Sequence, residues 1–259
     1  MPALDESRHA NASTAACLWK AGRRCSFRCA PVGIAVGSRS EEIFLASIEI
    51  NWAETGPISI FEEAHKLGFD LRRYESQPAD VKAAIKKLTI NQIIRLIREA
   101  WRESYDHDYA PGKDFNRIVN GVYVISVGGG FAVSYGSLSS EVMYIGRGKI
   151  ANRLRSHLVN WIFDMSLSLR DVPFKFFMET VGDGRSKGAF MDFEHFMLER
   201  FLKKFGDKPL INKIHGREGH IEHSFSGDWG RPFDNRTSKC FWAIRPSAQN
   251  AWFKEYRDE

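Results

Sequence analysis

The order of hydrophobic and polar positions predicts a helical region first along the chain. Apolar residues recur at three- and four-residue steps over residues 58–67 and again over 81–101, which is the spacing of amphipathic helices. In the second stretch, Thr89 and Gln92 have the spacing of a capping box, so we expect a new helix to start after Lys87. The polar residues of this region form no convergent set, which favours a packing or docking appendage.

A mixed region of strands and helices follows. Predicted strands, rich in β-branched and aromatic residues, cover residues 121–127, 142–146 and 174–181. Predicted helices cover residues 150–163, which have one apolar stripe, and 190–205, which are apolar on most of their surface. The glycines at 128–130 predict a turn and not a phosphate loop, because no Lys-Ser/Thr pair follows them. Strand, strand, helix, strand, helix is the order of a small α/β layer sandwich.

Composition adds a division of the chain into parts. The 259 residues are 43% hydrophobic and 27% charged, which suits a water-soluble protein that buries a core. Residues 1–40 are rich in Ala, Ser and Arg without a period, which predicts a disordered tail. We expect a small mainly helical region at 41–114, a core domain at 115–225 and an aromatic C-terminal extension at 226–259 that packs on the core.

The same composition predicts location and partners. No run of about 18 apolar residues and no apolar signal segment is present, so we expect a cytoplasmic protein that makes no membrane contact. Lys and Arg number 37 against 32 Asp and Glu, a formal charge of +5. The basic residues crowd positions 147–217, which favours a polyanionic partner.

The cysteines and late histidines leave one alternative open. Four cysteines at irregular spacing in a chain of this length predict no disulfide framework. His215, His220, His223 and Cys240 are a candidate zinc set, although their spacing matches no common zinc finger. The histidines are more typical of phosphate or solvent contacts.

One carboxylate stands on the most apolar helix. Glu194 lies among the aromatic and aliphatic residues of 190–205, where a charge must be paired, hydrogen-bonded or metal-bound. Asp192 and Glu199 lie about 200° and about 140° away around the helix, so neither shares its position. A single acid argues against a two-metal site and suits one hard cation with water ligands. The alternative is an ion pair between Glu194 and a basic side chain.

Four more residues have the chemistry of a phosphate site. Arg153 and His157 are four positions apart on the predicted helix 150–163 and therefore share a face. The guanidinium of Arg153 matches phosphate oxygens in shape and charge. Tyr123 and Tyr144 lie on two predicted strands, and their rings meet if the strands form a hairpin. For both tyrosines a simple core role is the alternative.

Together these motifs resemble the GIY-YIG endonuclease family. The matching residues, in the family's order, are Gly121-Val122-Tyr123, Tyr144-Ile145-Gly146, Arg153, His157, Glu194 and Asn212. The resemblance implies an α+β domain with a small three-stranded antiparallel sheet flanked by helices. It also implies hydrolysis of DNA phosphodiester bonds with one Mg²⁺ or Mn²⁺ ion. Val122 replaces the usual Ile, and the 21-position separation of the tyrosines (144 − 123) is more typical of restriction-type members.

The resemblance further implies roles for these residues. Tyr123 would be the general base, alone or with Tyr144 through a water, and Arg153 would hold the scissile phosphate and stabilise its transition state. Since free tyrosine has a pKa near ~10, this needs nearby cations or a transient proton acceptor such as His157. His157 would otherwise contact phosphate, and Asn212 would orient the site.

Metal and DNA contacts complete what the resemblance implies. Glu194 would be the only protein ligand of the metal, as suits an ion that keeps several waters. The residues expected to contact the DNA backbone are Arg147, Lys149, Arg155 and Lys213. A homodimer is compatible with cleavage of both strands.

Two other classes of protein remain as alternatives. A non-catalytic nucleic-acid-binding protein would keep the GIY-YIG fold without its activity. An unrelated α/β packing or docking protein would place the two tyrosines far from Glu194.

Overall fold

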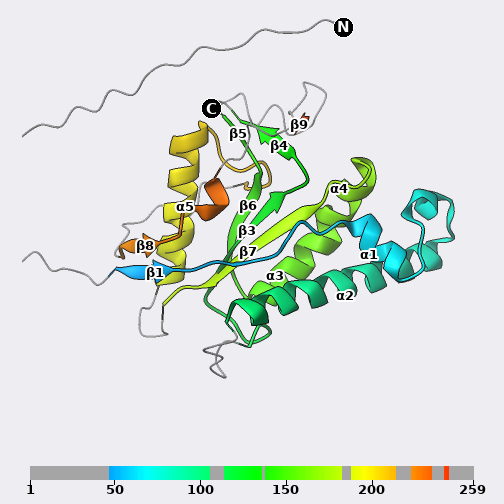
Figure 1. The fold of residues 1–259 in the computed structure, drawn as a ribbon, viewed down its shortest axis with the longest axis horizontal. Coiled ribbons are helices and arrows are strands. Elements are labelled where there is room, and N and C mark those ends of the chain that lie inside the picture. The colour runs from blue at the N-terminus through cyan, green and yellow to red at the C-terminus, as the bar shows by residue number, and fades with distance from the viewer. Residues whose placement is uncertain are drawn as a thin grey trace, which may run out of the picture. The chain divides into compact units, whose positions relative to one another are not determined.

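A four-stranded antiparallel sheet forms the centre of the protein (Figure 1). The computed structural model describes residues 47–105, 114–135, 138–182, 188–213, 223–234 and 242–244, all in one compact unit from Phe44 to Glu259. The strands, in their order across the sheet, are β2 (Ala53–Glu54), β7 (Phe174–Thr180), β3 (Gly121–Val127) and β6 (Val142–Gly148). The α+β class is thus confirmed, and β3, β6 and β7 match the three predicted strands.

The expected three-stranded sheet is wrong by one strand. β2 comes from the predicted helical region and pairs with β7, with Ala53 opposite Met178 and Glu54 opposite Phe177. A strand of two residues has no detectable period, so the hydrophobic pattern could not predict it. The region before residue 114 therefore contributes directly to the central sheet. The boundaries at 114/115 and 225/226 stay predictions.

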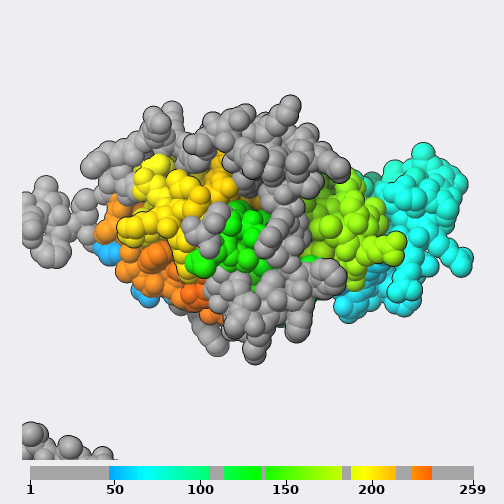
Figure 2. All heavy atoms as spheres, turned by 90° about the horizontal axis from the view of Figure 1, so that it is seen from above, coloured from blue at the N-terminus to red at the C-terminus, as the bar shows by residue number. Residues whose placement is uncertain are grey.

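Helices cover both faces of this sheet. On one face lie α3 (Ile150–His157), the wide turn η3 (Leu158–Ile162) and α4 (Phe163–Ser168), and on the other lies α5 (Ala189–Phe205). Figure 1 shows α5 on one side and α2 (Ala79–Ser104), α3 and α4 on the other. From above, α5 (yellow) and the α4 segment (yellow-green) lie on either side of the green strand residues (Figure 2). All seven residues of β3 are consequently buried.

The helix predicted over 150–163 differs from the structure in detail. It is interrupted by the π-helical turn η3, and its last segment extends to Ser168. In η3 the N–H of Phe163 donates to the carbonyl of Leu158, five residues earlier. A wide turn of this kind adds a residue without changing the apolar composition, so periodicity does not detect it.

The new helix expected after Lys87 is wrong. A single helix, α2 (Ala79–Ser104), continues through this point. Thr89 is fully buried in its interior, and among the described residues its hydroxyl has no hydrogen-bond partner. An N-terminus here would leave backbone N–H groups buried beside Ile90, so the continuous helix is the better solution. The other helical stretch forms α1 (Ile60–Lys66).

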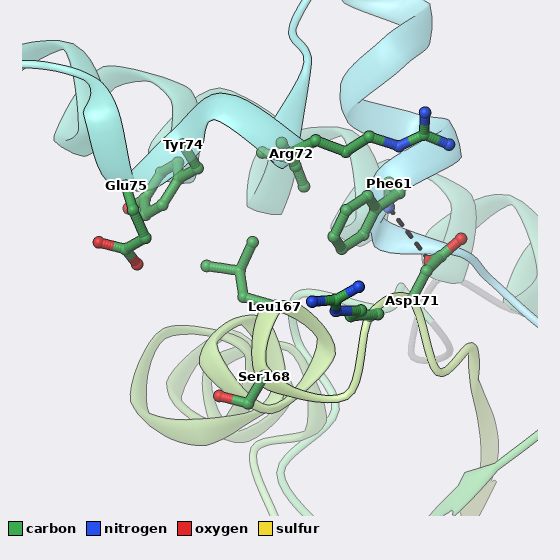
Figure 3. Close-up of a pocket in the computed structure, with 9 residues that line it drawn as sticks. Phe61, Arg72, Tyr74, Glu75, Leu167, Ser168 and Asp171 are labelled. Atoms are coloured by element: carbon green, nitrogen blue, oxygen red, sulfur yellow. Dashed lines mark hydrogen bonds between the residues drawn. The ribbon is translucent and has the colours of Figure 1, made fainter.

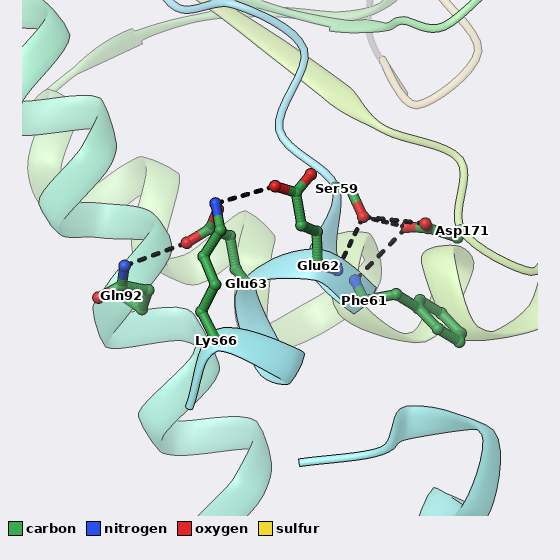
Figure 4. A network of polar contacts seen from close by, with 7 residues as sticks. All are labelled: Ser59, Phe61, Glu62, Glu63, Lys66, Gln92 and Asp171. Atoms are coloured by element: carbon green, nitrogen blue, oxygen red, sulfur yellow. Dashed lines mark hydrogen bonds and ion pairs between the residues drawn. The ribbon is translucent and has the colours of Figure 1, made fainter. Parts of the chain in front are cut away.

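Polar contacts fix α1 to its neighbours (Figure 4). Ser59 caps α1 by accepting a first-turn N–H, and its hydroxyl donates to Asp171 Oδ1 at 2.7 Å. The buried carboxylate of Glu63 accepts from Lys66 at 2.7 Å and from Gln92 of α2 at 3.0 Å. These bonds stabilise α1 against α2 and against the segment that follows α4.

A hollow of about 930 Å³ lies where α1, η1 (Leu71–Ser76) and the end of α4 meet (Figure 3). Two residues that line it, Arg170 and Asp171, have positive φ angles of 53° and 77°, which cost roughly 1–2 kcal/mol each for side-chain-bearing residues. The hydrogen bonds that the Asp171 carboxylate accepts from the Ser59 hydroxyl and the N–H of Phe61 hold this conformation. None of the motif residues lines this hollow.

Two smaller sheets complete the unit. β1 (Ile48–Ile50) pairs parallel with β8 (Phe225–Gly227). β4 (Phe131–Ser134) pairs with β5 (Ser139–Ser140) and β9 (Trp242–Ile244). The glycines at 128–130 form the predicted turn, closed by the bond from the N–H of Phe131 to the carbonyl of Gly128 at 3.1 Å, but β3 and β4 join different sheets.

The C-terminal aromatic residues that are described pack on α5. Ring centroids lie 4.9 Å apart for Trp229 and Phe196, and 5.6 Å apart for Phe233 and Phe201. The predicted tail at 1–40 and the positions of His215, His220 and Cys240 lie outside the described residues. None of the described helices has the length and apolar character needed to cross a membrane.

Candidate functional site

The candidate site is a cleft of about 740 Å³ at the outer edge of β6. Because β6 is an edge strand, side chains from both faces of the sheet reach the same cleft. The predicted site residues that line it are Tyr144, Arg147, Arg153, His157, Glu194, Asn212 and Lys213. Trp161, Phe190 and Leu198 add apolar walls. Tyr123 lies directly behind this lining and is fully buried.

The two tyrosines and His157 form one cluster on the α3 face. The Tyr123 and Tyr144 rings are stacked with centroids 5.9 Å apart, and the His157 ring lies 4.4 Å from that of Tyr144. His157 Nε2 is 2.9 Å from Tyr123 Oη. Pairing of β3 with β6 and the four-residue spacing of Arg153 and His157 together bring these groups into contact. The tyrosine that faces the cleft is Tyr144.

Two motif glycines make this cluster sterically possible. A Cβ atom at Gly146 would stand 2.4 Å from Tyr144 Cε1 and 2.7 Å from Tyr123 Oη. A Cβ atom at Gly121 would stand 2.3 Å from Ile150 Cδ1, at the start of α3. The first glycine allows the rings to lie against β6, and the second allows α3 to approach β3.

Burial and Arg153 set the protonation of the cluster. Loss of hydration, together with the Arg153 charge, lowers the pKa of His157 to about 4. Burial raises the pKa of Tyr123, and Tyr144 adds to this, whereas the Arg153 guanidinium beside it acts in the opposite direction. The adjacent Tyr123 hydroxyl in turn raises the pKa of Arg153. At neutral pH His157 is therefore uncharged, Tyr123 is protonated and Arg153 carries the positive charge.

Glu194 and Arg147 form an ion pair on the α5 face. Arg147 Nε lies 2.5 Å from Glu194 Oε2, and its guanidinium lies 5.7 Å from the centroid of the Phe190 ring. The alternative of an ion pair for Glu194 is thus present in the structure. Burial still raises the pKa of Glu194, with Arg147 opposing the shift. The carboxylate is poorly hydrated and borders the cleft.

Asn212 holds the chain against the free edge of β6. Its Oδ1 accepts from the N–H of Ile145 at 2.9 Å, and its Nδ2 donates to the carbonyl of Ile145 at 2.8 Å. The N–H of Ile211 donates to the carbonyl of Met143 at 3.0 Å. The segment therefore satisfies the edge strand much as another strand would. Asn212 thus fixes the position of the β6 backbone at Ile145, beside the motif residues Tyr144 and Gly146.

Two residues expected to bind DNA do not line the cleft. Arg155 lies about 200° around α3 from Arg153, and its Nη1 donates to Asn91 Oδ1 of α2 at 2.7 Å. Lys149 is exposed at the start of α3, outside the cleft lining. Arg155 is exposed and contacts α2 instead of the cleft, so the structure does not bring it together with the other residues expected to contact DNA.

Trp161 is a site residue that the sequence did not reveal. Its indole N–H donates to His157 Nδ1 at 2.9 Å. The hydrophobic pattern counted it only as part of an apolar stripe. A His and a Trp four positions apart on one helix were the signal that could have suggested this contact.

The zinc alternative is only partly within the described residues. His223 Nδ1 lies 2.7 Å from Asp192 Oδ2, so this histidine is paired with the first turn of α5. Across the described ranges, no group of three or more His, Cys, Asp or Glu side chains is arranged to hold a metal ion.

Comparison with protein-family models, curated proteins and solved structures finds no match for this chain.

Proposed function

We propose that this chain is a DNA endonuclease that hydrolyses phosphodiester bonds with one bound divalent cation. The observation that carries this proposal is the meeting of two sets of groups across the edge of β6. Tyr144, His157 and Arg153 come from one face of the sheet, and Glu194 comes from the other. A proton acceptor, a fixed cation and a lone carboxylate in one open cleft are what phosphodiester hydrolysis requires.

The cationic groups of the cleft suit a phosphate. Arg153 is exposed at the cleft wall, and Arg147 and Lys213 line the same space. Arg153 would bind the scissile phosphate and stabilise the charge that develops on its oxygens. Arg147 and Lys213 would contact the neighbouring backbone.

The tyrosine pair would receive the proton of the attacking water. Tyr144 lines the cleft and stacks on Tyr123, whose hydroxyl is held by His157. Tyr144 would first release its own proton to solvent. The water oxygen would then attack phosphorus while its proton passes to the Tyr144 phenolate, the bond between phosphorus and the leaving oxygen would break, and the leaving oxygen would take up a proton from solvent. Because Arg153 stands beside both hydroxyls, it favours the phenolate that accepts the proton.

Glu194 fits the role of a metal ligand. Among the residues that the structure describes, it is the only carboxylate in the cleft lining, and Mg²⁺ or Mn²⁺ held by one carboxylate would keep most of its water ligands. When bound, the cation would supply charge neutralisation at the phosphate. Arg147 occupies Oε2 of Glu194, so a cation would share the carboxylate with Arg147 or replace it.

Cleavage of supercoiled plasmid with Mg²⁺ tests the proposal. Glu194→Ala and Arg153→Ala should each lower the nicking rate at least about 100-fold, as loss of a group that stabilises the transition state does. Glu199→Ala and Arg155→Ala are matched controls, because they alter α5 and α3 away from the cleft. Both controls should retain the rate of the unaltered protein.

Three outcomes separate the candidate functions. Nicking that persists in both cleft variants would overturn the site. If the protein binds DNA without cleaving any DNA tried, and Arg147→Ala weakens this binding, the result would favour the non-catalytic binding protein. The structural support for that function is the ion pair between Arg147 and Glu194. Neither cleavage nor binding would favour a packing or docking protein. Sedimentation of the chain with and without DNA tests the expected homodimer.

A further inference from the structure

Trp161 makes a directional contact with His157. The indole Nε1 lies 2.9 Å from His157 Nδ1, and an indole N–H donates hydrogen bonds but accepts none. Nδ1 of His157 must therefore be the acceptor and carries no proton. The other ring nitrogen, Nε2, lies 2.9 Å from Tyr123 Oη.

The protonation of His157 determines the direction of its hydrogen bond to Tyr123. A neutral imidazole carries one proton, and with Nδ1 bare that proton is on Nε2. Burial and Arg153 keep the ring neutral at pH 7. The hydrogen bonds therefore run in one direction, from Trp161 to His157 and from His157 to Tyr123.

We propose that Trp161 is a positioning residue whose indole N–H fixes the Nε2–H tautomer of His157 and thereby makes His157 a hydrogen-bond donor to Tyr123. The tautomer is a property of the folded chain, whereas its catalytic meaning rests on the proposed nuclease function. His157 cannot then take a proton from Tyr123 while the bond to Trp161 holds. The role of transient proton acceptor is replaced by that of a donor that stabilises negative charge on Tyr123 Oη.

The surroundings hold Trp161 and His157 in this arrangement. The polar groups that face His157 are Tyr123 of β3, Tyr144 of β6, Arg153 of α3 and Trp161 of η3. The Trp161 ring also packs edge-on against Phe174 of β7, with centroids 6.0 Å apart. The π-helical turn that begins directly after His157 carries Trp161. Such turns are frequent at functional sites.

The consequence for Tyr123 is a defined direction for its own proton. Because Nε2–H of His157 occupies one side of Oη, the hydroxyl proton of Tyr123 points away from the histidine. Tyr144 lies on that route, stacked on Tyr123 and facing the cleft. The donors His157 and Arg153 thus favour negative charge on the tyrosine pair.

Nitrogen-15 NMR of the full chain labelled at histidine tests the tautomer directly. Protonated and unprotonated ring nitrogens have different shifts, and a His157→Gln variant identifies the His157 signals among the eight histidines. In the unaltered protein we expect Nε2 protonated and Nδ1 bare at pH 7. Trp161→Phe keeps the packing on Phe174 and removes the N–H, and should give a mixture of tautomers. Trp52→Phe, which removes an indole N–H bonded to the carbonyl of Trp229, is the control and should change nothing at His157.

Two NMR results would overturn the assignment of the His157 tautomer to Trp161. One is a proton on Nδ1 in the unaltered protein, which would count even if Trp161→Phe did not fold. The other is an unchanged tautomer in a folded Trp161→Phe variant. In the plasmid assay Trp161→Phe should lower kcat about 10-fold with an unchanged KM, the size of effect seen when a supporting contact is lost. A changed tautomer with an unchanged kcat would also overturn the positioning role. A protein that cleaves no DNA would contradict the proposed function alone, since the NMR result stands without it.

Discussion

Gly146→Ala is the smallest change that should disturb the candidate site without touching its chemistry. The added methyl group would stand 2.4 Å from Tyr144 Cε1 and 2.7 and 2.9 Å from Tyr123 Oη and Cζ. Ordinary contact begins near 3.4 Å, so the Tyr144 ring must move by about 1.0 Å (3.4 − 2.4). Tyr123 has less freedom, because it is fully buried and bonded to His157.

The expected loss has two parts. Extra volume in a packed interior costs about 1–3 kcal/mol, and removal of a glycine from a strand returns roughly 0.5–1 kcal/mol, so the midpoints (2 − 0.75) give a fall in the free energy of unfolding of about 1.3 kcal/mol. A displacement of about 1 Å at reacting groups lowers rates about 100-fold. Activity should therefore fall much more than stability.

Urea denaturation and plasmid nicking measure these two losses. Gly56→Ala is the control, because a Cβ atom there meets no atom within 4 Å, and it should leave nicking unchanged and stability unchanged or higher by up to about 1 kcal/mol. In Gly146→Ala/Tyr144→Ala the closest collision is gone, so the two changes should be non-additive in stability by about 0.5–3 kcal/mol. Full stability of Gly146→Ala, or strict additivity in the double variant, would refute the packing argument.

Two further predictions concern stability. Asn212→Ala should lower the free energy of unfolding by about 2–4 kcal/mol in urea titration, because both backbone groups of Ile145 lose a buried partner. Asn212→Asp should not restore this stability at pH 7, because its carboxylate would face the carbonyl of Ile145 without a proton to donate. Burial raises the pKa of Glu179 to about 7, so the folded state holds a proton that the unfolded chain releases. The stability from Glu179 should therefore be present at pH 4 and fall by up to about 3 kcal/mol between about pH 4.5 and 7. The difference in the free energy of unfolding between the unaltered protein and Glu179→Gln, measured across this pH range, separates this effect from that of His157, whose lowered pKa acts in the opposite direction. A difference that does not change with pH would contradict the prediction for Glu179.

Much of the fold follows from periodicity, because its elements are long and regular. β3, β6, β7, α1 and α5 were predicted to within a few residues. The pattern failed where structure depends on distant partners. β2 exists only because β7 offers an edge, and α2 runs through Thr89 because tertiary packing outweighs a local capping signal.

The sequence predicts those parts of the candidate site in which the spacing of residues alone determines where their side chains point. Tyr123 and Tyr144 meet because β3 and β6 pair, and Arg153 and His157 share a face of α3. The same helical geometry could have placed Arg155 outside the cleft, because it lies about 200° around α3 from Arg153. The partners of a polar group were less predictable, since Trp161 bonds His157 by virtue of a turn that no pattern reveals.

The sequence shows that the carboxylate of Glu194 needs a partner, but it does not show which residue is that partner. An acid on an apolar helix must have a partner, and for Glu194 that partner is Arg147. Yet the pKa of Glu194 remains raised, because lost hydration outweighs the attraction of Arg147. The ion pair therefore leaves the carboxylate under-stabilised, in a cleft that also holds Arg153 and the tyrosine pair. An ion pair that only holds α5 to β6 does not need an open cleft beside it. A ligand for a cation that arrives with phosphate, which is the role proposed for Glu194, needs both an under-stabilised carboxylate and an open cleft.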